Sequence, residues 1–396
     1  MSDIAPGTPS WLRERNDRTA LTLLLEHGAL TRTRLGELTG LSKPTAAQMV
    51  SRLERAGLIE AVGEVSAGRG PNAISYGVRG DRLHGVAIDI RERTIAAQLV
   101  DALDREYPVV EVETRGRDRT PEGDVRFAIE AATSAAGVDP DSVAMVCIGV
   151  QAAISLDGDT LSFTDTLPGW PELGARRRIE DALGLDVLLD NDVNLAAVAE
   201  RAAGAARDVA SFALIWMGDG LGLAIDLGGS LHRGATGSAG EIGYLPVPRS
   251  AADLDPDAED LTDLLGGAAV MELRGVPAGD PGGLAGAVRG LPDDDRALSA
   301  LADRVALGVV PVLAVLDPEL VVLGGPTGLA GGERLAELVA QRLSGPVARR
   351  ITDSSRWRPA VHTSGIAGQP VLGGARRMLV GRIHDRLVAD ISTITP

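Results

Sequence analysis

The stretch Leu38-Thr-Gly-Leu-Ser-Lys-Pro-Thr45 decides the architecture of the N-terminal part of this chain. Gly40 predicts a tight turn between two helices, because glycine adopts backbone conformations that other residues avoid. Ser42 is a typical helix N-cap, and Pro44 is in the first helical turn, where its missing N–H removes no hydrogen bond. Apolar residues then recur at helical spacing as far as Leu53. We therefore expect a helix from Ser42 to Leu53 that packs one face on a core.

The sequence on both sides of this helix supplies two more helices and a pair of strands. Residues 17–28 have the apolar spacing of one helix, and a second, short helix follows it. After the third helix, residues 59–65 and 74–78 have the composition of two strands joined by a turn-rich tip. These parts predict a winged helix-turn-helix over residues 16–82, preceded by a flexible arm at residues 1–15.

Four polar side chains of the third helix are expected to point away from the core, namely Lys43, Thr45, Gln48 and Arg52. The N-terminal residues of such a recognition helix reach base edges in the major groove. Lysine binds guanine edges or phosphate, glutamine pairs with adenine, and arginine grips phosphate. Arg69, between glycines at the wing tip, has the shape to enter a narrow minor groove. The alternative is a module that contacts another protein, with these side chains only solvated.

The charge of the chain is unevenly distributed. Residues 1–84 carry 11 Lys and Arg against 9 Asp and Glu, the remainder carries 28 against 46, and the net charge is −16. Such an acidic chain does not coat nucleic acid along its whole length. A mildly basic front and an acidic body favour a local contact with a double-stranded DNA operator.

From residue 83 onward the pattern changes to strands that alternate with helices, and a long helix ends the chain. This alternation predicts an α/β body. Cys147, the only cysteine, lies in a buried-strand pattern, so we expect core packing there. The N-terminus lacks a signal-peptide pattern, and no apolar run reaches the length of a membrane span. We therefore expect a cytoplasmic protein that does not contact the membrane.

Four motifs of the body follow one another in order: Leu188-Leu-Asp-Asn-Asp-Val-Asn194, Gly218-Asp-Gly-Leu-Gly222, Gly237-Ser-Ala-Gly-Glu-Ile-Gly243 and Leu323-Gly-Gly325. Together with the helix-turn-helix stretch, they make the chain resemble the ROK family, which comprises repressors, open reading frames and sugar kinases. The third motif is the most specific of the set. The resemblance spans nearly the whole chain, and its regulator branch places a winged helix-turn-helix before a sugar-kinase-like domain.

The resemblance implies the fold of the body. It is an α/β fold of the actin-like or sugar-kinase type, with two ribonuclease H-like lobes and a sugar cleft between them. The body would occupy residues 83–396. Lobe one would comprise about 83–192 plus the C-terminal helix, and lobe two about 193–370.

The resemblance also implies site residues in the cleft. Asn191 and Asp192 fall on positions that hydrogen-bond sugar hydroxyls, and in the kinases the aspartate is the general base for phosphoryl transfer. Glu241 falls on another hydroxyl acceptor. Clustered carboxylates and amides at strand ends do bind several hydroxyls at once. The alternatives are a helix N-cap for Asp192 and a structural role for Glu241.

One segment departs from the family pattern. The kinases use Asp-Ile-Gly-Gly-Thr after the first strand, where the glycines let backbone N–H groups approach phosphate. Here Arg91 and Glu92 replace both glycines, and Glu92 adds a negative charge where phosphate would lie. Because phosphoryl transfer depends on phosphate positioning, we expect no useful kinase activity although Asp192 is retained.

The residues of the family's zinc site are also missing. Tyr244 stands where the family has a histidine, and residues 245–267 contain neither cysteine nor histidine. A structural zinc site needs three or four such ligands, so we expect no metal and no cofactor. Tyr244 remains a candidate ligand-binding residue, since it can donate one hydrogen bond to a sugar.

These observations predict a transcriptional regulator rather than an enzyme. We expect a repressor of carbohydrate-utilisation genes that acts as a homodimer or homotetramer and responds to a small-molecule sugar bound between the lobes. Two alternatives stay open: a sugar kinase with a fused DNA-binding head, and a regulator whose body only dimerises.

Overall fold

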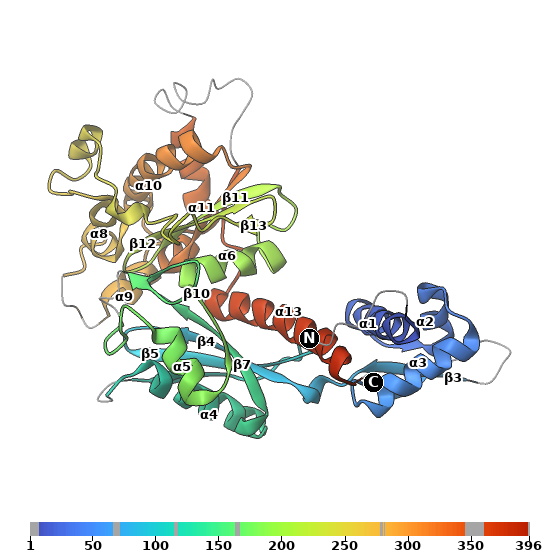
Figure 1. Cartoon of the computed structure of the whole chain (residues 1–396). Coiled ribbons are helices and arrows are strands. Elements are labelled where there is room, and N and C mark those ends of the chain that lie inside the picture. The colour runs from blue at the N-terminus through green and yellow to red at the C-terminus, as the bar shows by residue number, and fades with distance from the viewer. Residues whose placement is uncertain are drawn as a thin grey trace.

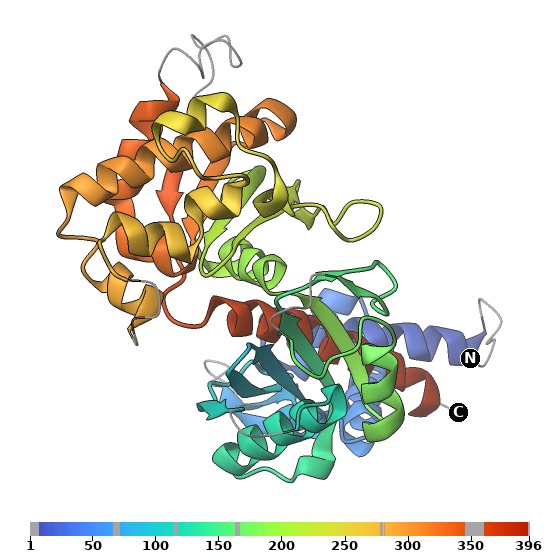
Figure 2. The ribbon, with the colours of Figure 1, turned by 90° about the vertical axis from the view of Figure 1, so that its left-hand side faces the viewer.

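The computed structural model places three bodies along the chain: a small N-terminal head, lobe one and lobe two (Figure 1). The same bodies are seen from the side in Figure 2. The α/β class and the winged helix-turn-helix are confirmed. The structure describes residues 8–394 except 66–71, 115–117, 163–166, 278–279, 281 and 345–359.

The head contains three helices and a small antiparallel sheet of order β1-β3-β2. Its core is apolar and includes Leu21, Met49 and Tyr76, each at most 1% exposed. The elements are α1 (Pro9–His27), β1 (Leu30–Thr31), α2 (Arg32–Thr39), α3 (Lys43–Arg55), β2 (Ile59–Val65), β3 (Ala73–Val78) and the short helix η1 (Gly80–Arg82).

The expectation of a flexible arm over residues 1–15 is wrong from Thr8 onward. Helix α1 begins at Pro9, and the Thr8 hydroxyl caps it by accepting a hydrogen bond from the Trp11 amide at 3.2 Å. The guanidinium of Arg15 lies 5.2 Å from the centre of the Trp11 ring, which adds a cation–π contact to this first part of the helix. A capping threonine followed by proline is a helix-start signal, and the apolar periodicity used for the prediction begins only about two turns later, at residue 17.

Lobe one is built on a five-stranded sheet of order β10-β7-β4-β5-β6. Helices α4 and α5 cover one face, where they pack on residues such as Ile88 and Ile148. Cys147 points to the other face and is fully buried, as expected. The elements are β4 (His84–Ile90), β5 (Thr94–Asp101), β6 (Val109–Glu113), α4 (Pro121–Ala136), η2 (Pro140–Ser142), β7 (Val143–Val150), β8 (Ala153–Ile154), β9 (Leu161–Ser162), α5 (Ala175–Leu183) and β10 (Asp186–Asn191).

Lobe two repeats the architecture of lobe one, with a five-stranded sheet of order β13-β12-β11-β14-β15. In both lobes an antiparallel three-stranded meander is extended by two parallel strands. The elements are β11 (Ser211–Met217), β12 (Leu221–Leu227), β13 (Ser230–Leu231), η3 (Ile242–Tyr244), η4 (Arg249–Asp253), α7 (Leu261–Leu265), α8 (Gly267–Leu273), α9 (Gly283–Arg289), α10 (Asp295–Leu316), β14 (Leu320–Gly324), α11 (Gly325–Leu343) and β15 (Ala360–Thr363).

Two helices, α6 (Asp192–Ala203) and α13 (Pro370–Ile394), lie between the two sheets. One side of α6 packs on lobe two through Val193 and Ala196, and Leu195 packs with α13 on lobe one. Figure 1 shows α13 continuing from this junction to the head, where it lies beside α1. The apolar core of the head is therefore continuous with α13, through residues such as Leu387.

Hydrogen bonds fix both ends of α13. At its N-terminal end, Gln369 accepts a hydrogen bond from Arg91 of lobe one at 3.0 Å. At its C-terminal end, Ser392 accepts one from Arg18 of α1 at 2.5 Å and donates one to Glu14 at 3.0 Å. A helix of 25 residues spans about 37 Å, so α13 connects the lobes to the head as one rigid element.

Among the described residues, helix α10 is long and apolar enough to cross a membrane, by length and composition alone. About half of its side chains, among them Leu301 and Val305, are buried in the core of lobe two. We therefore assign α10 as a core helix.

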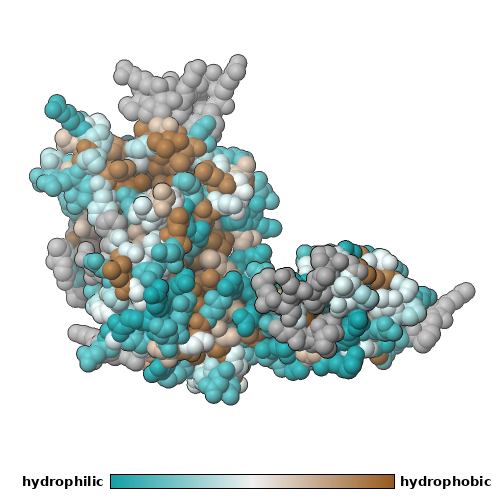
Figure 3. All heavy atoms as spheres, in the orientation of Figure 1, coloured by the Kyte–Doolittle hydropathy of each residue, from teal (hydrophilic) through white to brown (hydrophobic). Residues whose placement is uncertain are grey.

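On the face shown in Figure 3, apolar residues gather over lobe two, whereas the head is largely hydrophilic.

Candidate DNA-reading helix and ligand cleft

Helix α3 begins as the sequence predicts. Ser42 has extended backbone angles, and its hydroxyl accepts a hydrogen bond from the Thr45 amide at 3.5 Å. Gly40 lies in the left-handed region at φ 68° and ends α2. The buried face of α3 consists of Ala46, Met49, Val50 and Leu53. Local capping and one apolar stripe therefore fix both the start and the orientation of this helix.

Three of the predicted DNA-contacting side chains, Lys43, Thr45 and Gln48, are exposed on α3. The Thr45 hydroxyl lies 2.9 Å from the Ser42 hydroxyl, so this side chain is already oriented by the cap. The contact of these residues with DNA remains a prediction. Arg69 lies outside the described residues.

The expectation that Arg52 points outward is wrong. Its guanidinium donates two hydrogen bonds to Asp17 of α1, at 2.9 Å and 2.5 Å. Asp17 is 1% exposed, and burial raises the pKa of its carboxyl while Arg52 counteracts that rise. Arg52 thus balances a buried charge and holds the recognition helix against α1, with two of its five N–H donors bonded to Asp17 inside the head.

The sequence contains a signal for this ion pair that helical periodicity does not reveal. Asp17 stands one turn before Ala20 and Leu21 on the apolar stripe of α1, and an acidic residue at a core position requires a cationic partner. Helical periodicity alone left Arg52 at the edge of the buried face. The partner that turns it inward is 35 positions earlier in the chain.

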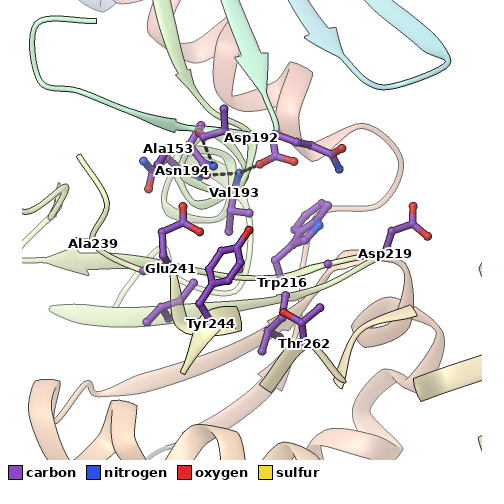
Figure 4. A pocket seen from close by; sticks show the side chains of 18 of the residues that line it. Ala153, Asp192, Val193, Asn194, Trp216, Asp219, Ala239, Glu241, Tyr244 and Thr262 are labelled. Carbon is purple, nitrogen blue, oxygen red and sulfur yellow. Dashed lines mark hydrogen bonds between the residues drawn. The ribbon is translucent and has the colours of Figure 1, made fainter. Parts of the chain in front are cut away.

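A cavity of about 350 Å³ lies between the lobes and contains the predicted ligand-binding residues. Asn191 and Asp192 come from the end of β10 and the start of α6. Glu241 and Tyr244 come from a loop of lobe two, residues 237–244, which begins with the third motif and is called the signature loop below. Figure 4 shows Glu241 and Tyr244 pointing toward the start of α6. The tertiary structure therefore brings together all four residues that the resemblance singled out.

Asn191 is the N-cap of α6. Its side-chain oxygen accepts hydrogen bonds from the amides of Val193 and Asn194 at 2.9 Å and 3.1 Å. Its side-chain nitrogen donates to the carbonyl of Ala152 at 3.1 Å. The capping role considered for Asp192 thus belongs mainly to its neighbour. Asn191 holds the edge of the cleft in place and has one N–H left for a ligand.

Asp192 is buried at the start of α6, and one carboxylate oxygen accepts from the Val193 amide at 2.8 Å. Burial, followed by the negative charge of Asp89, raises the pKa of Asp192 to about 7. Near neutral pH this carboxyl exists in both forms, so it can donate to or accept from a hydroxyl. Burial also raises the pKa of Glu241.

The signature loop reaches lobe one at Gly237. A side chain at this position would place its Cβ 1.7 Å from the carbonyl oxygen of Ile154, and the φ of Gly237 is 86°. Only glycine permits this contact between the lobes. In the same loop region, Arg233 forms an ion pair with Asp190 at 2.5 Å, which gives a second contact across the cleft.

The cleft also contains residues that the sequence analysis did not select. Trp216 lies near the end of β11, Asp219 lies just after that strand, and Thr262 lies on α7. Trp216 was detectable in principle, because a large aromatic residue at the carboxyl end of a core strand is a frequent ligand platform. Thr262 was not detectable, since only the folding of lobe two brings α7 to the cleft.

The turn between β4 and β5, where the kinases bind phosphate, is occupied by the protein's own side chains. Arg91 forms an ion pair at 2.6 Å with Asp89, which is 2% exposed. Arg119 donates hydrogen bonds to the carbonyls of Arg91 and Glu92 at 3.1 Å and 2.8 Å, and so holds the turn in place. In this turn, the guanidinium of Arg119 binds backbone carbonyls. In the kinase pattern, the same turn would present backbone amides to a phosphate.

No group of three or more histidine, cysteine, aspartate or glutamate side chains able to hold a metal occurs among the described residues. Tyr244 is 58% exposed at the cleft.

Comparison with known proteins agrees with this arrangement. A model of the ROK family matches residues 85–258, and a model of winged helix-turn-helix DNA-binding domains matches residues 13–60. The chain thus contains a ROK family domain. Its winged helix-turn-helix precedes the ROK domain, as the motifs predict.

Curated proteins similar to this chain include xylose repressors. The chain is 22% identical over 363 residues to the xylose repressor of Caldicellulosiruptor bescii. This match covers 85% of this chain and 90% of that protein. It is 22% identical over 244 residues to a putative xylose repressor of another Caldicellulosiruptor strain, where the match covers 61% of each protein.

Two solved structures show the fold. A ROK family transcriptional regulator, a homolog of the Escherichia coli MLC protein, matches 96% of this chain and 98% of that chain with a TM-score of 0.67 at 17% identity. The structure of a ROK family glucokinase from Streptomyces griseus, in complex with glucose and AMPPNP, matches 74% of this chain and 98% of that chain. Its TM-score is 0.58 at 25% identity. The regulator match includes the head, which the kinase match leaves out.

Proposed function

We propose that this protein is a transcriptional repressor of carbohydrate-utilisation genes, and that it binds operator DNA through α3 and a sugar through the cleft between its lobes. The observation that carries the proposal is the joining of an exposed α3 face, with Lys43 and Gln48, to a polar cleft by one continuous helix, α13. The xylose repressors among its relatives support a free sugar as effector. The site of action is then the cytoplasm, and two copies read two half-sites.

Helix α13 supplies a physical route from cleft to DNA. Arg91, which pairs with Asp89 beside Asp192, also hydrogen-bonds Gln369 just before α13 begins. The far end of α13 is bonded to α1, and α1 holds α3 through the ion pair of Asp17 and Arg52. A change in lobe closure that moves α13 therefore moves the recognition helix, provided that the sugar binds the two states with different affinity.

The test is operator binding with and without sugar. A genomic fragment selected by the full-length protein should bind with an affinity that changes when xylose or glucose is added, measured by fluorescence anisotropy. Equal operator affinity in the presence and absence of every sugar tested would contradict the sugar-responsive part of the proposal. The protein would then be a DNA-binding regulator whose body only dimerises.

The residues that read DNA are tested by two substitutions in α3. Gln48→Ala should relax specificity at one base position at a cost of about 1–3 kcal/mol, because it removes a base contact. Lys43→Ala should weaken binding to all sequences and lower the slope of log affinity against log salt by about one unit. The control is Arg334→Ala in lobe two, which removes the same charge from an exposed pair with Glu337 far from the head. Unchanged affinity in both α3 variants would place another element in the groove.

One observation favours the kinase alternative, since Asp192 has a pKa near 7, which suits a general base. The occupied β4–β5 turn opposes it. We expect no sugar-dependent ATP consumption by this protein in a coupled assay across hexoses and pentoses, with the Streptomyces griseus glucokinase as positive control. Turnover comparable to that of the control would make the protein an enzyme with a fused DNA-binding head.

A further inference from the structure

A buried arginine, Arg304, lies on α10 in the interior of lobe two and does not itself line the ligand cleft. It is 4% exposed. Its guanidinium donates hydrogen bonds to the carbonyls of Leu264 at 3.2 Å and of Leu254 at 3.1 Å. It also lies 3.4 Å from the carboxylate of Asp255. A buried charge is costly unless it is paired and hydrogen-bonded, so these three contacts stabilise the arginine inside lobe two.

All three partners of Arg304 belong to residues 245–265, which follow the signature loop and are called the wall segment here. The two ends of this segment meet where the amide of Leu261 donates to the carbonyl of Leu245 at 3.0 Å. The wall segment forms one side of the ligand cleft through Asp260, Thr262 and Asp263. Arg304 therefore binds, from behind, the part of lobe two that faces the ligand.

The cleft-facing part of the wall segment includes α7, a helix of only five residues. So short a helix is not stable by itself and depends on its neighbours. Its start is capped by Asp260, but the last four carbonyls of a helix have no partner within it. Arg304 binds one of them, that of Leu264. One turn later on α10, a Cβ added to Gly308 would lie 2.8 Å from Cδ1 of Leu265, so α10 and α7 are in close contact.

The wall segment is also the region for which the resemblance implies a zinc site, and its residues do not fit one. Tyr244 stands at the histidine position, and residues 245–267 contain neither cysteine nor histidine. The carboxylate of Asp255 faces Arg304, and those of Asp260 and Asp263 form the capping box of α7. In the part of the chain that the structure describes, no group of side chains provides the ligands of a structural zinc.

We propose that Arg304 is the positioning residue of the cleft wall, and that it fixes the wall segment to α10 in the place of a structural metal. This inference rests on the proposed function and adds how the ligand cleft is held in shape. A guanidinium directs five N–H donors in a fixed plane, so it binds two carbonyls and a carboxylate at once. The cleft would then keep its shape, and the protein its response to sugar, without any metal.

Hydrogen exchange of the full-length protein without ligand tests the inference directly. Arg304→Met replaces the guanidinium by an apolar side chain and should make the amides of residues 245–265 exchange about tenfold faster. The amides of α13 and of the head should keep their protection. Treatment of the wild-type protein with EDTA should leave the exchange of the wall segment unchanged.

Sugar and operator affinities separate positioning from general stability. Arg304→Met should weaken the binding of xylose or glucose about tenfold in calorimetry, because it displaces the cleft wall. Its operator affinity without sugar should equal that of the wild type, since the head is untouched. Arg304→Lys retains the charge but lacks the planar fork, so it should recover only part of the lost sugar affinity.

Arg342→Met is the matched control. Arg342 also donates two side-chain hydrogen bonds to α10, to Asp303 at 2.9 Å and to Ser299 at 2.8 Å, and neither partner belongs to the wall segment. This variant should leave the exchange of residues 245–265 and the sugar affinity unchanged. Equal effects of Arg304→Met and Arg342→Met would overturn the inference, because both would then report a general loss of stability.

The remaining outcomes keep the inference apart from the proposed function. Faster exchange of the wall segment in wild-type protein treated with EDTA would show that a metal holds it, and would overturn the inference. A wild-type protein that binds no sugar would contradict the proposed function, while the exchange data would still decide whether Arg304 positions the wall. If Arg304→Met does not fold, the same exchange measurement on Arg304→Lys decides, and protection equal to the wild type there would overturn the inference.

Discussion

Replacing Asp17 by alanine should abolish operator binding and destabilise the head by about 3 kcal/mol, because the change leaves the guanidinium of Arg52 without its counter-charge between α1 and α3. Asp17 is on the face of α1 that packs inside the head and touches no DNA in the proposed mode. The effect would therefore come from the position of the recognition helix. Operator affinity and amide hydrogen exchange of α1 and α3 would measure it.

Two controls make the result specific. Glu37→Ala breaks an exposed ion pair with Arg34 in the same head and should cost less than about 1 kcal/mol. The double change Asp17→Leu with Arg52→Met removes the whole buried pair and should recover most of the lost stability, since apolar side chains replace buried ion pairs at little cost. A single Asp17 variant that binds DNA normally would show that the pair does not position α3.

Replacing Gly237 by alanine should weaken sugar binding at least about 100-fold and leave the protein folded. The added methyl group would lie 1.7 Å from the Ile154 carbonyl oxygen, so the signature loop must withdraw from lobe one and carry Glu241 and Tyr244 with it. A displacement of about 1 Å at a binding site is enough for such a loss. Calorimetry with xylose or glucose would measure the affinity, and a thermal scan would monitor folding.

Gly229→Ala is the matched control for this change. Gly229 has a φ of 81°, close to that of Gly237, yet nothing lies within 4 Å of its missing Cβ. Both substitutions cost about 1 kcal/mol in backbone conformation. Only the change at Gly237 forces the lobes apart, so equal sugar affinity in the two variants would show that contact between the signature loop and lobe one is not needed for binding.

Features with local causes were predictable from the sequence. The caps at Ser42 and Gly40, the apolar face of α3 and the continuous apolar run of β7 need no distant partner, and the structure has them where the sequence placed them. The start of α1 at Pro9 was equally local, through the Thr8 cap, and was missed because apolar periodicity was given more weight than capping.

Features that depend on distant partners could not be predicted from single segments. Arg52 is directed inward because the buried Asp17 accepts its hydrogen bonds across the head. Asn191 caps α6, and its side-chain N–H also donates to the carbonyl of Ala152. The sequence predicts that Arg91 prevents phosphate binding. The structure adds an ion pair with Asp89 and a hydrogen bond to Gln369, and the second contact connects Arg91 to the start of α13.

The sequence by itself determined the order of the modules, the start of the third helix and four of the cleft residues, because caps, periodicity and ordered motifs are properties of contiguous residues. Only the tertiary structure decided which charges of those residues are free. Arg52 and Arg233 pair with buried carboxylates from other segments, and Arg91 pairs with a buried carboxylate two residues away. Within the described part of the chain, the acidic side chains that line the cleft form no ion pair. Charge pairing between segments depends on distances that folding alone sets, and those distances determine what the cleft can bind.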